Sequence, residues 1–122
     1  MSERISEAEH AVMEVLWDEA PLGAAEVAER VAPSRNWSPR TVKTLLSRLL
    51  AKGVVAHEEE GRRYLYRPAV ARADFVAQES GRLLDRMFGG RVTPLVTHLA
   101  EQDRLTPQDI AEIEALLKAL KS

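Results

Sequence analysis

The side chains best suited to chemistry in this sequence lie together on one face of a predicted helix between Ser38 and Gly53. At about 100° per residue, that face gathers cations and hydroxyls and no carboxylate, whereas a solvated helix face usually mixes both signs of charge. Cations bind phosphates and guanine edges, and small hydroxyls permit close approach to bases, so the face is suited to the major groove of DNA. Its members are Arg40, Thr41, Lys43, Thr44, Ser47 and Arg48.

The same helix carries its own start and stop signals. Ser38 and Pro39 are typical of an N-cap and a first helical position, and Lys52 and Gly53 are typical of a C-terminal end. Thr41 has a second interpretation, because at the third helical position it can bond back to the cap. A bland interpretation of the cations is that they only keep the helix solvated. The opposite face is apolar and consists of Val42, Leu45, Leu46, Leu49 and Leu50.

The flanking elements supply a setting for this helix. A capping box at Ser6–Glu9 predicts a helix over 6–19, and a shorter helix follows over 24–31, so the basic helix completes a helix-turn-helix. After it, 54–59 and 63–67 are predicted strands of a hairpin, which corresponds to a wing with Arg62 and Arg63 at its tip. We expect Glu58–Glu60 to pair with neighbouring arginines across the hairpin; the alternative is that they weaken its contact with DNA.

Charge is distributed unevenly along the 122 residues. Ten of the 17 Lys/Arg and only three of the 19 Asp/Glu lie between Arg30 and Arg72, which indicates a basic working surface on an acidic body. No cysteine is present, which removes thiolate chemistry, and no apolar run approaches a membrane span. The polar N-terminus is unlike a signal peptide, and we expect a cytoplasmic protein without membrane insertion.

Catalysis and metal binding have little support in the sequence. His10, His57 and His98 lie far apart and have no paired ligand spacing, so we expect no metal site and no cofactor. No nucleophile set, carboxylate pair or glycine-rich phosphate loop is positioned by a motif, so we do not expect an enzyme. Trp17 and Trp37 are interpreted as core anchors rather than base-stacking residues.

Residues 71–122 are predicted to form three amphipathic helices. The first ends at Gly89-Gly90, the second begins at Thr93 and the third begins at Thr106-Pro107. About 50 residues of this kind hold too little core to be stable alone, so we expect a twofold homodimer. The alternative is that the helices fold back on the domain formed by 1–70. The predicted dimerisation residues are Leu84, Met87, Phe88, Leu95, Leu99, Ile113, Leu116, Leu117 and Leu120. The expected fold class is mainly α with a small β-hairpin: an N-terminal winged helix-turn-helix plus a C-terminal three-helix dimerisation region.

Several of these motifs together resemble the BlaI/MecI/CopY family of bacterial repressors. The resemblance is carried by Ser6–Glu9, by Trp37–Val42 and by Gly89-Gly90, and it covers nearly the whole chain. It implies a homodimer that binds a palindromic double-stranded DNA operator and blocks transcription. The matching DNA-reading residues are Arg40, Thr41, Lys43, Thr44 and Arg48.

The resemblance also raises the question of how DNA is released. One branch of the family is cleaved at an Asn-Phe bond downstream of a membrane sensor protease for β-lactams, and the matching pair here is His98-Leu99. The branch that senses copper uses C-terminal cysteines, which this chain lacks. A repressor released by a small ligand is an alternative. A winged helix that binds proteins and does not read DNA is the rival from another class.

Overall fold

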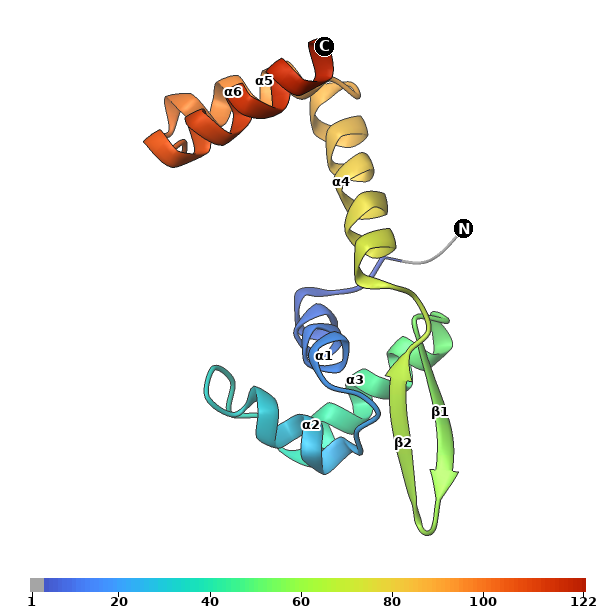
Figure 1. Ribbon diagram of the computed structural model, residues 1–122. Helices are drawn as coiled ribbons and strands as arrows, with labels where there is room; N and C mark the ends of the chain where they lie inside the picture. The colour runs from blue at the N-terminus through green and yellow to red at the C-terminus, as the bar shows by residue number, and fades with distance from the viewer. Residues whose placement is uncertain (1–3) are drawn as a thin grey trace. The chain divides into compact units, whose positions relative to one another are not determined.

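The computed structural model describes residues 4–122 as six helices and one hairpin (Figure 1). The chain divides into two compact units, the first ending at Phe75 and the second covering Val76–Ser122. The predicted fold class, mainly α with a small β-hairpin, is confirmed. The elements are α1 (Glu7–Asp18), α2 (Ala24–Val31), α3 (Pro39–Ala51), β1 (Val55–Glu60), β2 (Arg63–Pro68), α4 (Arg72–Phe88), α5 (Val92–Glu101) and α6 (Pro107–Lys121).

Helices α1, α2 and α3 pack on one another around a single apolar core. Leu46 and Leu49 of α3 are fully buried against Val12 and Met13 of α1 and Val27 of α2. Apolar residues at helical spacing on each helix produce this arrangement, because each stripe must be covered by the others. The predicted role of Trp17 and Trp37 as core anchors is confirmed, since both are partly buried against this cluster.

The hairpin follows α3 directly and is tied to the helices. Gly53 ends α3 with a φ of 75°, and β1 then pairs antiparallel with β2, with Glu60 opposite Arg63 across a turn of two residues. Leu22, in the segment between α1 and α2, forms a bridge with Tyr66 through two backbone hydrogen bonds of 3.0 and 2.8 Å. The hairpin is therefore fixed to the α1–α2 connection along β2, as in a winged helix.

The first turn of α4 belongs to the first unit. Arg72 donates two hydrogen bonds, of 2.8 and 3.1 Å, to the Glu14 carboxylate on α1. Phe75 packs against Trp17 with the two rings tilted by 47° and their centroids 5.3 Å apart, and the Trp17 indole N–H donates to the Val70 carbonyl at 2.9 Å. These contacts attach the start of α4 to the outer side of α1.

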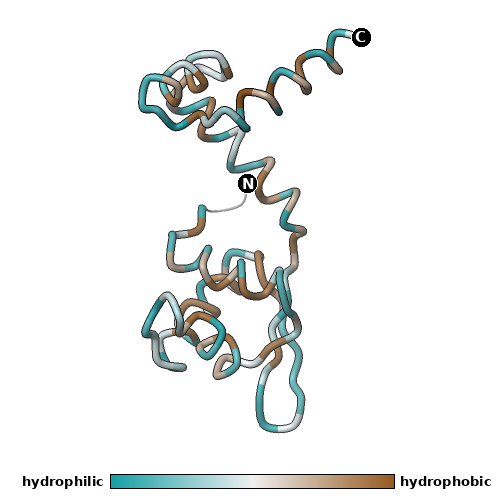
Figure 2. Tube along the Cα trace, turned by 60° about the vertical axis from the view of Figure 1, so that its left-hand side comes forward, coloured by the Kyte–Doolittle hydropathy of each residue, from teal (hydrophilic) through white to brown (hydrophobic). Residues whose placement is uncertain are grey.

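The second unit differs from the first in having no buried side chain on its helices, all of whose residues are described. Met87 is 59% exposed and Leu120 is 72% exposed. In Figure 2 the C-terminal helix alternates apolar and polar residues along its length. Within residues 4–122, no helix is long and apolar enough to cross a bilayer.

Candidate nucleic-acid interface

Helix α3 begins where its local chemistry dictates. The Ser38 hydroxyl accepts a hydrogen bond from the Thr41 backbone N–H at 3.2 Å, and Pro39 occupies the first helical position. This capping satisfies a donor that the helix cannot satisfy itself. The Thr41 hydroxyl lies 3.2 Å from the Ser38 hydroxyl, so the second interpretation of Thr41, as part of the cap, is confirmed.

All six polar residues of the predicted reading face are exposed, while Val42, Leu45, Leu46 and Leu49 on the other side are buried. The Thr44 hydroxyl donates to the Arg40 carbonyl at 3.2 Å. Among residues 4–122, the side chains of Arg40, Lys43 and Arg48 have neither a hydrogen-bond nor an ion-pair partner, and no carboxylate shares their face. The helix therefore presents three unneutralised cations and several small hydroxyls to solvent.

The far end of α3 is held by an ion pair that the sequence did not predict. The Lys52 ammonium donates to the Glu9 carboxylate at 2.7 Å and to the Arg4 carbonyl at 3.0 Å. Glu9 is 1% exposed and also accepts from the Ser6 backbone N–H at 2.7 Å. Its second oxygen is buried and has no hydrogen-bond partner. The pair joins the last turn of α3 to the first turn of α1.

Two opposing influences act on the Glu9 carboxyl. Burial raises its pKa, but hydrogen bonds from Lys52 and Ser6 together lower the pKa by more, so the net pKa lies below the ordinary value. Glu9 is therefore a carboxylate at neutral pH, so its ion pair with Lys52 is formed at that pH. Its spacing contained a signal that sequence analysis missed: Glu9 lies three and four residues before the buried Val12 and Met13.

The hairpin contributes a second set of cations beside α3. Arg40 and Lys43 line a hollow of about 550 Å³ together with Arg62 and Arg63 of the hairpin. The rest of its lining comes from the start of α2, from the first residue of α3 and from two tyrosines of β2, namely Gly23, Ala24, Ala25, Pro39, Tyr64 and Tyr66. The structure thus brings together cations from two segments that lie about 20 residues apart in the sequence.

The two arginines of the hairpin tip are in different states. Arg62 has no partner among the described residues, whereas Arg63 donates to Glu26 of α2 at 3.0 Å and lies 3.9 Å from Glu60. The expectation that Glu58–Glu60 all pair with arginines is wrong: only Glu60 does. Glu59 accepts from the Tyr64 hydroxyl at 3.2 Å instead, since Tyr64 is its cross-strand neighbour.

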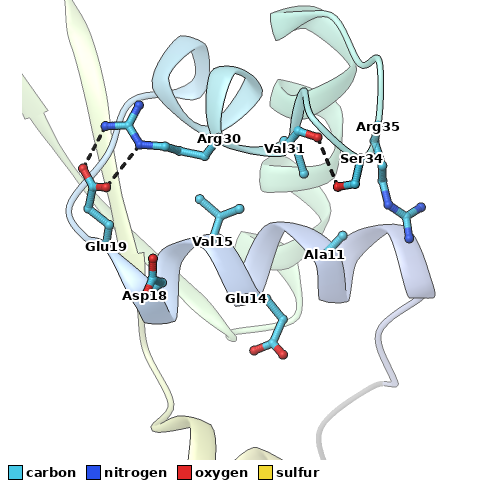
Figure 3. Close-up of a pocket in the computed structure, with 9 residues that line it drawn as sticks. All are labelled: Ala11, Glu14, Val15, Asp18, Glu19, Arg30, Val31, Ser34 and Arg35. Atoms are coloured by element: carbon cyan, nitrogen blue, oxygen red, sulfur yellow. Dashed lines mark hydrogen bonds and ion pairs between the residues drawn. The ribbon is translucent and has the colours of Figure 1, made fainter.

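A larger hollow, of about 670 Å³, lies between α1 and α2 and contains none of the predicted DNA-binding residues (Figure 3). Val15 and Val31 face each other across it, and Arg30 holds Glu19 at its edge through hydrogen bonds of 3.1 and 2.8 Å. Both of its cations already have ion-pair partners, because Arg30 pairs with Glu19 and Arg35 pairs with Glu7 on α1. The unneutralised cations are on the α3 and hairpin side.

No group of three or more His, Asp or Glu in the described chain could hold a metal ion. His10 stacks on Phe75, with ring centroids 5.6 Å apart, and His57 lies 4.5 Å from Tyr64. His98 is exposed on α5. The histidines of the described chain are thus placed as ring-packing or surface residues.

The three packed helices, the hairpin and the unneutralised face of α3 define a DNA-binding winged-helix protein. Comparison with known families agrees: the model of the penicillinase repressor family matches residues 5–119. The chain belongs to this family, whose members are transcriptional repressors rather than enzymes.

Relatives cover the chain almost end to end. A penicillinase repressor of Bacillus licheniformis is 33% identical over 119 residues, which is 98% of this chain and 93% of the relative. A methicillin resistance regulatory protein, MecI, of Mammaliicoccus sciuri is 28% identical over 93% of this chain and 92% of the relative.

Solved structures give the same result for the fold. The DNA-binding domain of the repressor BlaI is 37% identical with a TM-score of 0.53, covering 61% of this chain and 93% of that domain. Monomeric BlaI of Bacillus licheniformis, solved with the blaP half-operator, is 36% identical with a TM-score of 0.51, and the match covers 61% of this chain and 90% of that protein. Apo MarR of E. coli, at 18% identity and a TM-score of 0.55 over 95% of this chain and 77% of that protein, shares the fold.

Proposed function

We propose that this repressor acts in the cytoplasm as a homodimer on a palindromic double-stranded operator and blocks transcription by occupying it. The observation that carries the proposal is the face of α3, where the side chains of Arg40, Lys43 and Arg48 are exposed and have no partner among the described residues. Phosphate contacts from this face and from Arg62 supply salt-dependent affinity. Arg40, Lys43 and Thr44 reach base edges, with one α3 in each half-site. The half-operator complex of monomeric BlaI supports the DNA-binding part of the proposal, because the matched part of that relative shares the fold and is 36% identical.

The exposed apolar side chains of the second unit support the dimer. Leu116, Leu117 and Leu120 are 58%, 49% and 72% exposed on α6, although each is a large aliphatic residue. Exposed stripes of this kind are covered by partners in stable proteins. Two half-sites bound by one dimer gain affinity through effective concentration, so the apolar stripe and the cationic face act together. The fold-back alternative would cover the same side chains without a second copy.

The relatives support a proposal for the regulated genes, and the resemblance to the repressor family supports one for the release step. Because relatives are penicillinase and methicillin resistance repressors, we infer control of genes of the β-lactam-resistance type. We further infer release by proteolysis at His98-Leu99 by a membrane sensor protease. This bond lies inside α5, and the Gln102 N–H donates to the His98 carbonyl at 3.1 Å, so cleavage requires α5 to open locally. Opening costs least before a second copy covers the unit, because α5 has no buried side chain in the single chain. A release by a small ligand would leave this bond intact.

Operator binding by alanine variants tests the proposed function. We expect Arg40→Ala and Lys43→Ala each to weaken binding to a duplex selected from a random pool by about ten-fold or more, since each good base contact contributes roughly 1–3 kcal/mol. Arg104→Ala, which removes an exposed cation from the second unit, is the matched control. If both α3 variants bind as wild type does, α3 is not the reading helix, and a selection that enriches no palindrome would favour the protein-binding alternative.

A further inference from the structure

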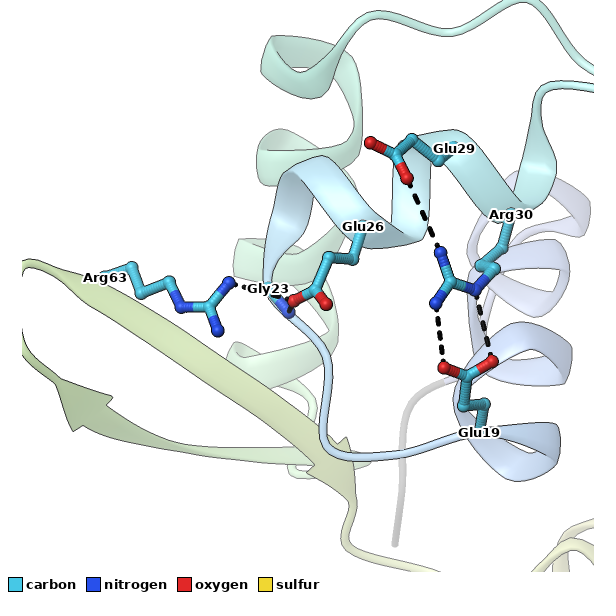
Figure 4. Close-up of polar contacts among 6 residues, drawn as sticks. All are labelled: Glu19, Gly23, Glu26, Glu29, Arg30 and Arg63. Carbon is cyan, nitrogen blue, oxygen red and sulfur yellow. Dashed lines mark hydrogen bonds and ion pairs between the residues drawn. The ribbon is translucent and has the colours of Figure 1, made fainter.

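Arg63 was expected to contact DNA at the tip of the hairpin, but its guanidinium is bonded to a carboxylate of the protein, although 56% of the side chain is exposed. It is the first residue of β2, and it reaches the Glu26 carboxylate of α2 at 3.0 Å (Figure 4). Its other terminal nitrogen lies 3.9 Å from Glu60 on the opposite strand. Arg62, the preceding residue, has no partner among residues 4–122. Adjacent arginines therefore have different surroundings, one free and one held.

The carboxylate that holds Arg63 has a second task. The same Glu26 oxygen accepts the Gly23 backbone N–H at 2.9 Å, which is the half of a capping box that a glycine N-cap allows. One oxygen thus joins the first turn of α2 to the first residue of β2. The contact is close, because a Cβ at Gly23 would lie 3.3 Å from this oxygen and 3.4 Å from the Arg63 guanidinium. Glycine at this position leaves room for the bond.

The bond also complements a contact further along the hairpin. Tyr66, three residues after Arg63, is paired through its backbone with Leu22. The Leu22–Tyr66 bridge anchors the base of β2, and the Glu26–Arg63 bond anchors the end next to the turn. A two-stranded hairpin is barely stable alone in water, so its direction depends on such anchors. With both contacts in place, the hairpin keeps Arg62 beside the hollow that Arg40 and Lys43 also line, while the Arg62 side chain itself stays unpaired among the described residues.

We propose that Arg63 is a positioning residue rather than a DNA contact, and that its bond to Glu26 holds the hairpin so that Arg62 meets the DNA backbone beside α3. This inference rests on the proposed function, since it concerns how the same surface binds DNA. It assigns a DNA-binding role to a carboxylate, Glu26, that does not touch DNA.

The sign of one substitution separates positioning from contact. If Arg63 contacted phosphate, Glu26→Gln would strengthen DNA binding, because it would free the guanidinium and remove a negative charge close to DNA. If the bond positions the hairpin, Glu26→Gln weakens binding although the protein becomes more positive. The side-chain oxygen of a glutamine at the third helical position still accepts the Gly23 N–H, so the start of α2 keeps this hydrogen bond. Glu29→Gln is the matched control: it removes the same charge from α2, and Glu29 pairs with Arg30 at 3.6 Å rather than with the hairpin (Figure 4).

The experiment measures dissociation constants of the full chain for one selected duplex by fluorescence anisotropy. We expect Glu26→Gln and Arg63→Gln each to weaken binding about three-fold, the effect of losing a partly exposed ion pair, and the double variant to weaken it no further. Arg62→Ala should weaken binding in the wild-type background and much less in the Glu26→Gln background. Arg63→Lys, which keeps the charge, should recover part of the loss, and a thermal melt of each variant checks that it is folded.

Two results overturn the inference. Tighter binding by Glu26→Gln, or an Arg62→Ala effect that is the same in both backgrounds, would show that Arg63 contacts DNA itself or has no part in binding. The proposed function fails differently: in that case Arg40→Ala would bind the duplex as wild type does, or the wild-type chain would select no duplex, which would overturn both proposals.

Discussion

The winged helix and the helices after it differ in how far their apolar side chains are buried. In the winged helix Leu46 and Leu49 are fully buried, and even a carboxylate, Glu9, is enclosed and paired. In the second unit no helix has a buried side chain, and Leu116 and Leu120 are 58% and 72% exposed. The first unit has a core of its own, whereas the second unit has apolar side chains that remain exposed in the single chain. DNA recognition requires a rigidly folded domain, and dimerisation requires an apolar surface that a second copy can cover.

A matched pair of leucine truncations gives the largest expected effect. Leu46→Ala should lower the free energy of unfolding by about 4 kcal/mol, because it leaves a cavity in the core of the winged helix. This loss should be independent of protein concentration. Leu116→Ala should instead raise the concentration at which the dimer dissociates, as measured by analytical ultracentrifugation. A Leu116→Ala variant that stays dimeric at the wild-type concentration would remove the contrast between the units.

The buried ion pair provides the next test of the winged helix. Lys52→Met leaves the Glu9 carboxylate enclosed without its cation, and should lower the free energy of unfolding by about 3 kcal/mol in urea titrations. Arg30→Met is the control, since it breaks a pair with Glu19 that is largely exposed to solvent. Equal, small losses for the two variants would show that the pair does not anchor α3.

The same carboxylate makes the winged helix sensitive to acid. The folded pKa of Glu9 lies below its ordinary value of 4.5, so the ion pair contributes its full stability above about pH 4.5 and loses it as the pH falls through the lower, folded pKa. Urea unfolding followed by Trp17 and Trp37, both in the winged helix, should show this decline. Glu9→Gln should flatten it while lowering stability at pH 7. An unchanged acid limb in Glu9→Gln would contradict the assignment.

Two helix caps offer the smallest and most symmetrical comparison. Ser38 caps α3 in the winged helix and Thr106 caps α6 in the second unit, each accepting a backbone N–H at 3.2 and 3.0 Å respectively. Ser38→Ala should lower the free energy of unfolding detected by tryptophan fluorescence by about 1 kcal/mol. Thr106→Ala should leave that transition in place and weaken the dimer instead. If both substitutions shift the tryptophan signal equally, the two units unfold together.

Local signals were sufficient to predict much of this structure. The cap at Ser38-Pro39, the glycine after Lys52 and the turn near Gly61 fix the ends of α3 and of the hairpin within one or two residues. Each of these ends depends only on a few residues that are neighbours in the sequence, so the sequence alone is enough to predict it. The exposed cations of α3 were predicted for the same reason, because helical periodicity separates them from the buried leucines.

Contacts between distant residues were not predictable in this way. The Glu9–Lys52 pair joins residues 43 apart, and the Glu26–Arg63 bond joins residues 37 apart. Both depend on how helices and hairpin pack, which periodicity does not specify. The glutamates of the hairpin were misjudged because nearby arginines in the sequence are not always the nearest partners in the fold. Arg63 donates to Glu26 on α2, and Glu59 accepts a hydrogen bond from the Tyr64 hydroxyl.

The central claim, that the unneutralised cations of α3 and the hairpin bind the DNA backbone, is tested most directly by the salt dependence of binding. Dissociation constants for a selected duplex would be measured between 50 and 200 mM salt, roughly the range over which phosphate contacts are strongly screened. With Arg40, Lys43, Arg48 and Arg62 free in each protomer, the account predicts a slope of log affinity against log salt of about −3 to −4 per protomer. A slope near zero would contradict it.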